Sequence, residues 1–481
     1  LLAEYLRPAT GFALPVVPEA SSRGRSIRLV CRGNPLPDAA GFYPEQYSIS
    51  VLEDSATLAA DSPAGLARAV QTLRQLLPCE IFSRQAVSRA WSLPCVSIED
   101  RPLLRWRGLH LDVARHFFSV EEVCRFIDLM ALHRFNVCHL HLVDDQGWRV
   151  EIEKYPLLTE VASRRRQTLV GHEGSRPRRY DGRPYGGFFS KADIREIVDF
   201  AERRKITVLP EIELPGHSQA ALSAYPELGC TGEKIEARCH WGISQHVYNV
   251  EESTISFLCD VLDEVVGMFP SLFIHIGGDE APKHQWAESP RVQERMAELG
   301  VRSEEELQSW FIKRIGTHLG NRGRRLIGWD EILEGGLAPG AAVMSWRSEE
   351  GGVTAARQGH DVVMAPSQKV YFDHYQSAPV EQEPLAIGGL QTTEAVYAYN
   401  PVPEALEKKF HHHVLGGQGQ LWTEYIADFR HLEYMAYPRA CALAEVLWLP
   451  DCEKSLPRFL AALQTHRGRL EALGVNAHPR P

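Results

Sequence analysis

Eight strand-like apolar runs follow one another from Trp106 onward, and most of them are separated by amphipathic helical patterns. Such alternation builds parallel sheets, because each strand returns to the same edge through a crossover helix. Eight units in one domain predict an α/β fold of the closed (β/α)₈ TIM barrel type, and a doubly wound open sheet is the alternative that shares the pattern. The runs cover residues 107–113, 136–143, 207–213, 273–278, 325–329, 341–346, 361–365 and 413–418.

Three of the helical patterns carry start signals. Ser119 is followed three residues later by Glu122, and Ser303 by Glu306, which is the spacing of a capping box. Ser190 opens a third pattern with apolar residues on one face. We therefore expect helices to begin at these three serines.

A smaller α/β domain at residues 1–100 is expected to precede the barrel at 101–481. The alternation of Tyr47, Ile49 and Val51 predicts a strand, and Ser62-Pro63 opens an amphipathic helix. The stretch from Pro94 to Pro102 is interpreted as the linker. A chain of 481 residues has room for a barrel plus such a partner.

Composition narrows the classes of partner. Apolar residues make up 44% of the chain, enough for a core, and a net charge of -10 gives no reason to bind the phosphates of a nucleic acid. No apolar run reaches the roughly 18 residues that span a bilayer, so we expect no membrane span.

The cysteines and the N-terminus bear on compartment. Ten cysteines without a CxxC pair are interpreted mostly as buried thiols, and a disulfide between Cys230 and Cys239 is left open. The start LLAEYLRP lacks a signal peptide's features and resembles a mature or trimmed end. We expect an exported protein whose targeting segment is absent from this sequence, with a cytoplasmic location as the alternative. The oligomeric state is left open.

Polar and aromatic residues follow nearly every predicted strand. In a TIM barrel the chemistry lies at the C-terminal ends of the strands, so these residues are expected to converge. Carboxylates beside aromatic rings suit a sugar, which has an apolar face to stack and hydroxyls to hydrogen-bond. In chain order they are Arg115, Asp144, Asp145, Glu211, Glu213, His217, Asp279, Glu280, Trp329, Trp346, Tyr371, Asp373, Trp422 and Glu424.

Each of these residues also has a plain structural interpretation. The sequence GGDE by itself is typical of a solvated loop, and tryptophans at strand ends are often core residues. Arg115 could form a structural ion pair or hold substrate hydroxyls, with Asp144 or Asp145 fixing its guanidinium. His217 could support the site or only the fold.

Adjacency of Asp279 and Glu280 constrains the mechanism. Neighbouring residues on a strand point to opposite sides of it. A retaining glycosidase that uses two carboxylates needs its acid and its nucleophile on the two sides of the scissile bond, with the carboxyl groups about 5–5.5 Å apart. Adjacent residues suit that arrangement poorly. The pair can flank one sugar if the nucleophile comes from the substrate. The oxygen of a 2-acetamido group can play that part.

Seven ordered motifs give the chain its family resemblance: RGLHLDVARHFF, HLVDDQGWR, PEIELPGHS, HIGGDE, IGWDE, MSWR and LWTEY. Together with the helix PAGLARAVQTLRQLL they make nearly the whole chain resemble the β-N-acetylhexosaminidases of glycoside hydrolase family 20. One position departs from the pattern, because the family more often has Asp where Glu213 stands. We expect this change to be harmless, since Glu213 lies outside the acid pair.

The resemblance implies a retaining, exo-acting enzyme for terminal β-linked N-acetylhexosamine in a glycan or chitooligosaccharide, with no metal and no cofactor. It implies that Glu280 is the general acid and base, and that Asp279 holds the acetamido N–H while the acetamido oxygen attacks C1. The other implied roles concern binding. Tyr371 would hydrogen-bond the acetamido oxygen, and the pocket would be walled by Trp329, Trp346 and Trp422. The ring hydroxyls would be held by Arg115, Asp373 and Glu424, while Asp144 would orient Arg115 and His217 would support the acid pair. Preference between N-acetylglucosamine and N-acetylgalactosamine is left open.

Three other functions compete. A metal-dependent amidohydrolase is suggested by His139-Leu140-His141, but the lysine and further histidines of such a site are missing, and His411–His413 is interpreted as a surface loop at the wrong end of the barrel. A sugar-binding protein without activity could use the same fold. Within the family, a wider pocket would release a disaccharide, as a lacto-N-biosidase does.

Overall fold

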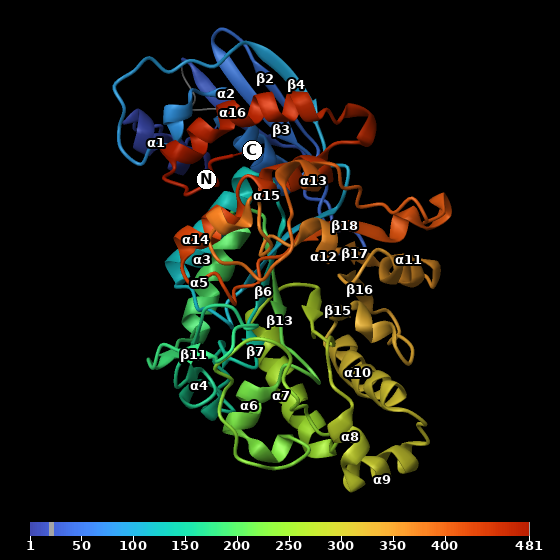
Figure 1. The fold of residues 1–481 in the computed structure, drawn as a ribbon. Coiled ribbons are helices and arrows are strands. Elements are labelled where there is room, and N and C mark those ends of the chain that lie inside the picture. The colour runs from blue at the N-terminus through green and yellow to red at the C-terminus, as the bar shows by residue number, and fades with distance from the viewer. Residues whose placement is uncertain (19–23, 481) are drawn as a thin grey trace.

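The computed structural model describes residues 1–18 and 24–480. Figure 1 shows two parts stacked along the long axis, a small sheet with its helix at the top and a barrel below it. The last helix, α16 (Leu456–Ala472), runs across the small part, so the C-terminal end of the chain lies beside the N-terminal domain.

Eight parallel strands close the barrel, which confirms the predicted TIM barrel and rules out the open sheet. Their order around the barrel is β13-β14-β15-β16-β17-β18-β5-β6. All eight fall within the predicted runs or extend one by a single residue. They are β5 (Trp106–Asp112), β6 (Val137–His141), β13 (Thr207–Glu211), β14 (Phe273–His275), β15 (Arg325–Trp329), β16 (Ala342–Ser345), β17 (Val362–Met364) and β18 (Val414–Gly419).

The three predicted helix starts are confirmed. The Ser119 and Ser190 side chains each complete a capping box, at the start of α3 (Val120–Leu132) and α5 (Lys191–Arg203). Ser303 accepts a hydrogen bond from the Glu306 N–H at the start of α10 (Glu304–Asn321). Each cap satisfies a backbone N–H that has no partner inside its helix.

Helix α1 (Leu2–Thr10) lies beside the small domain in Figure 1. The remaining helices cover the barrel and its loops. They are α4 (Leu157–Glu160), α6 (Gln219–Ala224), α7 (Glu252–Met268), α8 (His284–Glu288), α9 (Pro290–Leu299), α11 (Glu350–Arg357), α12 (Ser367–Val370), α13 (Thr393–Tyr397), α14 (Phe429–Ala436) and α15 (Arg439–Trp448). Short strand pairs decorate the long loop between β6 and α5: β7 (Val143–Asp144) with β8 (Gly147–Trp148), β9 (Arg164–Arg165) with β12 (Tyr185–Gly186), and β10 (Leu169–Val170) with β11 (Arg179–Tyr180). The strand-and-helix rhythm predicted none of these pairs.

The N-terminal sheet contains four strands, in the order β1-β3-β2-β4. They are β1 (Ser26–Cys31), β2 (Tyr47–Val51), β3 (Ser55–Ala60) and β4 (Val96–Asp100), and α2 (Pro63–Leu76) packs on them. Ser62 caps α2 as expected. The linker interpretation of Pro94–Pro102 is wrong, because residues 96–100 pair with β2 along their whole length as an edge strand.

Contacts between the two parts are buried and polar as well as apolar. Trp448, at the end of α15, packs into the core of the small sheet, and its indole N–H donates to Asp100 of β4 at 2.8 Å. Glu45 lies between Arg68 of α2 and Arg107 of β5, at 2.6 Å from each. The small domain is therefore fixed to the barrel by specific contacts.

Three sequence expectations can be compared with the fold. All ten cysteines are free, so Cys230 and Cys239 are unpaired, and only four of the ten are buried, so the expectation for most of them is wrong. His411–His413 does lie partly exposed, in a short 3₁₀ helix before β18. In the part of the chain that the structure describes, no helix combines the length and apolarity needed to cross a membrane.

Candidate active site

The chain turns sharply after β14. The strand ends at His275, and Gly277, Gly278 and Glu280 all take positive φ angles, of 63°, 93° and 45°. Gly277 is required for space as well, because a Cβ there would overlap the Glu213 carboxylate. Asp279 and Glu280 therefore stand on a tight turn and not on an extended strand.

Both carboxylates of the pair face one imidazole. His217 Nε2 lies 3.6 Å from Asp279 Oδ2 and 3.5 Å from Glu280 Oε2. The expectation that the two side chains point to opposite sides of a strand is thus wrong, because the left-handed turn brings them to the same side. Two carboxylates on one side cannot act as acid and nucleophile from opposite faces of a sugar, which supports a nucleophile that comes from the substrate.

A chain of charged groups continues behind His217. Its Nδ1 lies 3.2 Å from Asp144 Oδ1, and the other oxygen of Asp144 lies 2.7 Å from Arg115 Nη2. Asp145 does not contact Arg115 in this way, since its carboxylate accepts the backbone N–H groups of Gln219 and Ser244. Of the two acids considered for fixing the guanidinium, the contact is made by Asp144.

Charges in this chain support one another. Burial disfavours a charged imidazole, but Asp144 outweighs it and raises the pKa of His217 well above its usual range. Burial also acts against a charged Asp144, and Arg115 and His217 together hold the pKa of that carboxyl well below its usual range. At neutral pH the pocket thus holds a charged imidazole beside the acid pair.

Asp279 and Glu280 differ in their surroundings. Asp279 is only 7% exposed, and its Oδ1 atom has no hydrogen-bond partner among the described residues. Burial, with a contribution from Glu280, raises the pKa of Asp279 to about 7 against the opposing charge of His217. The Glu280 side chain is 33% exposed and can meet solvent.

The predicted aromatic residues lie near one another. Trp346 stacks on Tyr371 with 6.2 Å between ring centroids, and Trp422 lies 5.8 Å from Trp329. The Arg115 guanidinium lies 5.0 Å from the Trp422 ring. Trp346 and Trp422 are partly exposed, as pocket walls would be, whereas Trp329 is 1% exposed and packs on His275.

Asp373 and Glu424 are close enough to influence each other. Burial and the charge of Glu424 raise the pKa of Asp373 well above its usual range, and Asp373 Oδ1 lacks a partner among the described residues. Arg115 lowers the pKa of Glu424, although burial outweighs it. Two acids and one arginine in one recess can bind neighbouring hydroxyls.

Glu331 belongs to this group and was missed by the sequence analysis. It accepts a hydrogen bond from the Trp346 indole at 2.9 Å, and burial with the nearby charge of Asp279 raises its pKa to about 8. It follows Trp329 by two residues in the motif IGWDE. That position after the fifth barrel strand was the available signal.

Glu211 and Glu213 lie deeper than the pocket. Glu211 is fully buried in the barrel, where it binds His275 at 2.8 Å and also contacts His139 and His141. Neither oxygen of Glu213 has a hydrogen-bond partner among the described residues, and burial followed by the charge of Asp279 raises the pKa of this carboxyl well above the usual range. Glu213 is thus not one of the acid pair but is influenced by the charge of Asp279, and the expectation that this position is harmless stays a prediction.

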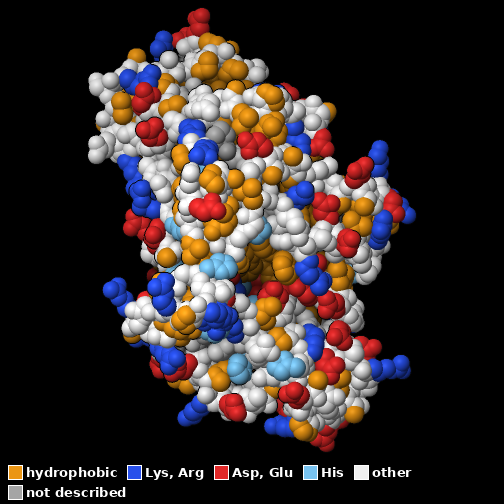
Figure 2. All heavy atoms as spheres, in the orientation of Figure 1, with side chains coloured by type: hydrophobic (Ala, Val, Ile, Leu, Met, Phe, Trp, Pro, Cys, Tyr) orange, Lys and Arg blue, Asp and Glu red, His pale blue; other side chains and the backbone are white. Residues whose placement is uncertain are grey.

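The surface is hollowed near the middle of the face in Figure 2, with hydrophobic side chains inside and acidic ones along the rim. Figure 1, in the same orientation, places the barrel strands β6, β13 and β15 at this level. A recess lined in this way suits a ligand with an apolar face and many hydroxyls.

Two family models match the chain. Residues 104–451 match "Glycosyl hydrolase family 20, catalytic domain", and residues 1–101 match "Glycosyl hydrolase family 20, domain 2". These matches contradict the amidohydrolase alternative.

Individual relatives agree. A β-hexosaminidase from Porphyromonas gingivalis is 44% identical over 99% of the chain, which spans 60% of that relative's length. The structure of a β-N-acetylhexosaminidase from Streptomyces coelicolor A3(2) superposes with a TM-score of 0.85 at 32% identity, covering 100% of this chain and 90% of that one. An exo-β-N-acetylglucosaminidase from Vibrio harveyi, solved with N-acetylglucosamine, gives 0.79 at 33% identity, covering 94% and 69%.

Proposed function

The chain belongs to glycoside hydrolase family 20, and on that premise we propose that it is an exo-acting, retaining β-N-acetylhexosaminidase. Its substrates are glycans or chitooligosaccharides that end in β-linked N-acetylglucosamine or N-acetylgalactosamine. The observation that carries the proposal is the pairing of a buried Asp279, with one carboxylate oxygen free, and a more exposed Glu280 on the same charged imidazole.

The reaction runs in two steps. In the first, Glu280 gives its proton to the glycosidic oxygen, the bond from that oxygen to C1 breaks, and the acetamido carbonyl oxygen of the substrate bonds to C1. Asp279 accepts the acetamido N–H and stabilises the positive charge of the resulting oxazolinium ion. In the second, Glu280 takes a proton from water, which attacks C1 from the side that the leaving group left. The bond from C1 to the acetamido oxygen breaks and restores the acetamido group, so the configuration is retained.

The remaining groups bind and position the sugar. We assign the acetamido oxygen to Tyr371, whose hydroxyl lies in the same recess as Asp279 and Glu331. Trp346 and Trp422 enclose the ring, with Trp329 behind them, and Arg115, Asp373 and Glu424 hold hydroxyls at its far end. His217 and Asp144 keep the acid pair and Arg115 in place.

The test is release of 4-nitrophenol from the β-N-acetylglucosaminide, the β-N-acetylgalactosaminide and the plain β-glucoside. We expect both acetamido substrates to be cleaved and the glucoside to resist, because it lacks the internal nucleophile. Glu280→Gln should lower kcat by about 10²- to 10⁴-fold, and Glu288→Gln, on the surface helix α8, should not. Equal cleavage of the glucoside would exclude the acetamido group as nucleophile.

A disaccharide-releasing enzyme is the second candidate, because the loops that close the pocket set the length of the product. Release of 4-nitrophenol from the β-lacto-N-bioside, with the monosaccharide glycosides inert, would favour it. Binding of N-acetylglucosamine without hydrolysis of any of these glycosides would leave only a sugar-binding role.

A further inference from the structure

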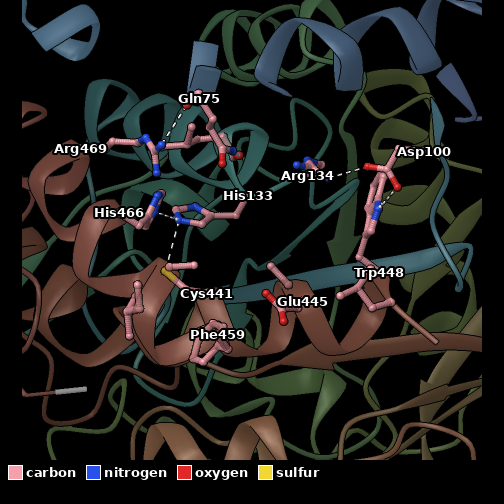
Figure 3. Close-up of a pocket in the computed structure, with 15 residues that line it drawn as sticks. Gln75, Asp100, His133, Arg134, Cys441, Glu445, Trp448, Phe459, His466 and Arg469 are labelled. Carbon is pink, nitrogen blue, oxygen red and sulfur yellow. Dashed lines mark hydrogen bonds and ion pairs between the residues drawn. The ribbon is translucent and has the colours of Figure 1, made fainter. Parts of the chain in front are cut away.

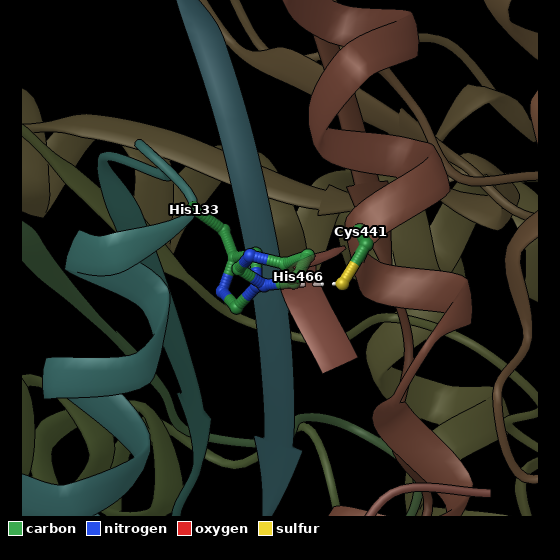
Figure 4. Close-up of side chains that lie close together, drawn as sticks. All are labelled: His133, Cys441 and His466. Carbon is green, nitrogen blue, oxygen red and sulfur yellow. Dashed lines mark hydrogen bonds between the residues drawn. The ribbon is translucent and has the colours of Figure 1, made fainter. Parts of the chain in front are cut away.

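Three metal-binding side chains converge at the interface between the barrel and the C-terminal helices, away from the pocket. They are His133, at the C-terminal end of α3, Cys441 on α15 and His466 on α16. His133 Nε2 lies 2.9 Å from His466 Nε2 and 3.3 Å from Cys441 Sγ, and all three atoms lie within 4.8 Å of one another. Figure 4 shows the three side chains pointing toward one another.

The same side chains line a cavity of about 320 Å³, shown in Figure 3. Its wall also contains charged groups, but these are engaged elsewhere. Arg134 and Asp100 bind each other at 3.1 Å, Arg469 donates to the carbonyl of Gln75, and Glu445 accepts from a tyrosine hydroxyl. The cavity supplies room for water next to the cluster.

The protons of the cluster can be assigned. His133 Nδ1 lies 2.7 Å from the carbonyl oxygen of Leu129, which can only accept, so this nitrogen carries the hydrogen. With its hydrogen on Nδ1, the ring presents a bare Nε2 to the cluster. The carbonyl thus fixes the tautomer that presents a lone pair to the cluster, as outer partners of metal-binding histidines do.

One lone pair therefore faces two hydrogen donors. His466 Nε2 can approach to 2.9 Å only if it carries a proton, and the thiol of Cys441 points its sulfur at the same atom. A single imidazole lone pair accepts one good hydrogen bond, so one of the two donors is poorly satisfied. A cation in place of these two protons would satisfy all three atoms.

We propose that His133, Cys441 and His466 form a zinc site that joins α3 to α15 and α16. Tetrahedral zinc, with bonds of about 2.0–2.1 Å to nitrogen and 2.3 Å to sulfur, places two nitrogens about 3.3 Å apart and a nitrogen and a sulfur about 3.6 Å apart. The corresponding distances of 2.9 Å and 3.3 Å need to open by only a few tenths of an ångström. Water from the cavity takes the fourth position.

Binding is balanced in protons and charge. Cys441 releases its proton to solvent and binds as a thiolate, and His466 moves its hydrogen from Nε2 to Nδ1, so one proton leaves for each zinc ion bound. One thiolate and two neutral imidazoles suit Zn²⁺ better than Mg²⁺ or Ca²⁺, which prefer oxygen.

The site would tie the end of the chain to both domains. Helix α16, which carries His466, also contacts the small domain through the bond from Arg469 to the Gln75 carbonyl at 2.9 Å. A metal bound only by the folded arrangement stabilises it in proportion to its affinity. Zinc is therefore expected to raise the temperature of thermal unfolding.

Co²⁺ is the probe that separates this site from the pocket. Two groups of side chains in the pocket could also hold a cation, but neither contains sulfur. One is His217 with Asp279 and Glu280, and the other is His217 with Asp144 and Asp145. Only a cysteine ligand gives the intense thiolate-to-Co²⁺ absorption in the near ultraviolet. The whole chain, freed of metal and kept reduced, is titrated with Co²⁺ and then with Zn²⁺.

We expect one equivalent of Co²⁺ to produce this band and one equivalent of Zn²⁺ to remove it. Cys441→Ser should abolish the band, His466→Gln should weaken Zn²⁺ binding by at least about tenfold, and Cys452→Ser, at an exposed free thiol, should change neither. Zinc should raise the unfolding temperature of the native chain and of Cys452→Ser, but not that of Cys441→Ser or His466→Gln. Absence of the band from the native chain, or its persistence in Cys441→Ser, would overturn the proposal.

If Cys441→Ser fails to fold, Zn²⁺ binding by His466→Gln tests the proposal in its place. This position is only partly buried, and hydrolysis of the 4-nitrophenyl glycoside reports that the variant is folded. An active His466→Gln protein that binds Zn²⁺ as tightly as the native chain would also overturn the proposal.

Discussion

The two oxygens of Asp144 contact different cations, because Oδ1 lies 3.2 Å from His217 Nδ1, whereas Oδ2 lies 2.7 Å from Arg115 Nη2 and 2.8 Å from His141 Nε2. This carboxylate is 1% exposed, so water does little to screen either contact. One buried negative charge therefore maintains both the imidazole behind the acid pair and the arginine proposed to hold hydroxyls.

Asp144→Asn should damage both functions at once. The amide keeps the shape but removes the negative charge nearest to both buried cations, so the free energy of unfolding should fall by about 3 kcal/mol. We expect kcat/KM for the 4-nitrophenyl N-acetylglucosaminide to fall at least about tenfold, which is about 1.4 kcal/mol of transition-state stabilisation. Asp451→Asn, at an exposed carboxylate that pairs with Lys454, is the control and should leave both quantities unchanged.

Activity should fall on the acid side with a midpoint near pH 7. Burial first, and then Glu280, raise the pKa of Asp279 to about 7, and the proposed mechanism needs its carboxylate form. Below that pH the free protein is protonated, so kcat/KM should drop about tenfold per pH unit. Removing the charge of Glu280 lowers the pKa of Asp279, so the residual activity of Glu280→Gln should persist to lower pH. An acid limb in the same place in both proteins would contradict this assignment.

Glu331 should act as a neutral hydrogen-bond acceptor at the pH of the assay. With a pKa of about 8, the Glu331 carboxyl group is protonated and neutral at pH 6, and a glutamine amide resembles that neutral form. The amide oxygen can still accept the hydrogen bond from the Trp346 indole N–H. We expect Glu331→Gln to change KM less than about threefold at pH 6, and Glu331→Ala to raise it about tenfold, the cost of one buried hydrogen bond. Equal KM values for the two variants would show that the contact with Trp346 does not position the ring.

Local rules explain how much of the fold the sequence predicted. The eight barrel strands are continuous apolar runs, because parallel strands covered by helices are buried on both faces, and three helix starts were marked by serine caps. Strand β4 was mistaken for a linker because two prolines flank it and none of its five residues is buried. The short pairs between β6 and α5 have two residues per strand, too few for any periodicity.

The site was predictable to the level of which residues gather, and less so in their geometry. Position after a barrel strand was enough to select Asp279, Glu280 and Arg115. The direction of the acid pair was not, because it depends on the left-handed turn at residues 277–280. Glu331 was missed because its link to Trp346 joins two different strand ends, a contact that only the closed barrel creates.

Glu213 should tolerate loss of its ionisable group better than loss of its length. Burial and the neighbouring acids keep its carboxyl group neutral at pH 7, and its oxygens lie against Gly277. Glu213→Gln preserves volume and charge, so we expect kcat/KM within about threefold of the native value. Glu213→Asp removes one buried methylene and should cost about 1 kcal/mol of unfolding free energy. Chemical denaturation and initial rates measure the two effects, and a greater loss for Gln than for Asp would mean that Glu213 is charged.

Glu45 should determine how firmly the small domain is held on the barrel. Its carboxylate lies 2.6 Å from both Arg68 and Arg107, and Arg68 also donates to the Lys205 carbonyl at 2.7 Å, so the cluster spans both domains. Burial disfavours the charged form, but Arg107 and Arg68 together lower the pKa of Glu45 below its usual value. The ion cluster therefore contributes stability above pH 4–5, near the unfolded pKa of about 4.3, and this contribution is lost as the pH falls through the lower folded pKa.

Glu45→Gln leaves two buried guanidinium groups without their counter-ion, and we expect it to lower the free energy of unfolding at pH 7 by about 3–5 kcal/mol. The difference from the native protein should shrink toward pH 3, because the native carboxylate then begins to take up a proton. Glu80→Gln removes an exposed partner of Arg89 and should cost less than about 1 kcal/mol at either pH. Guanidinium denaturation at the two pH values measures all three proteins, and a loss for Glu45→Gln that is no larger than the loss for Glu80→Gln would show that the cluster does not stabilise the domain interface.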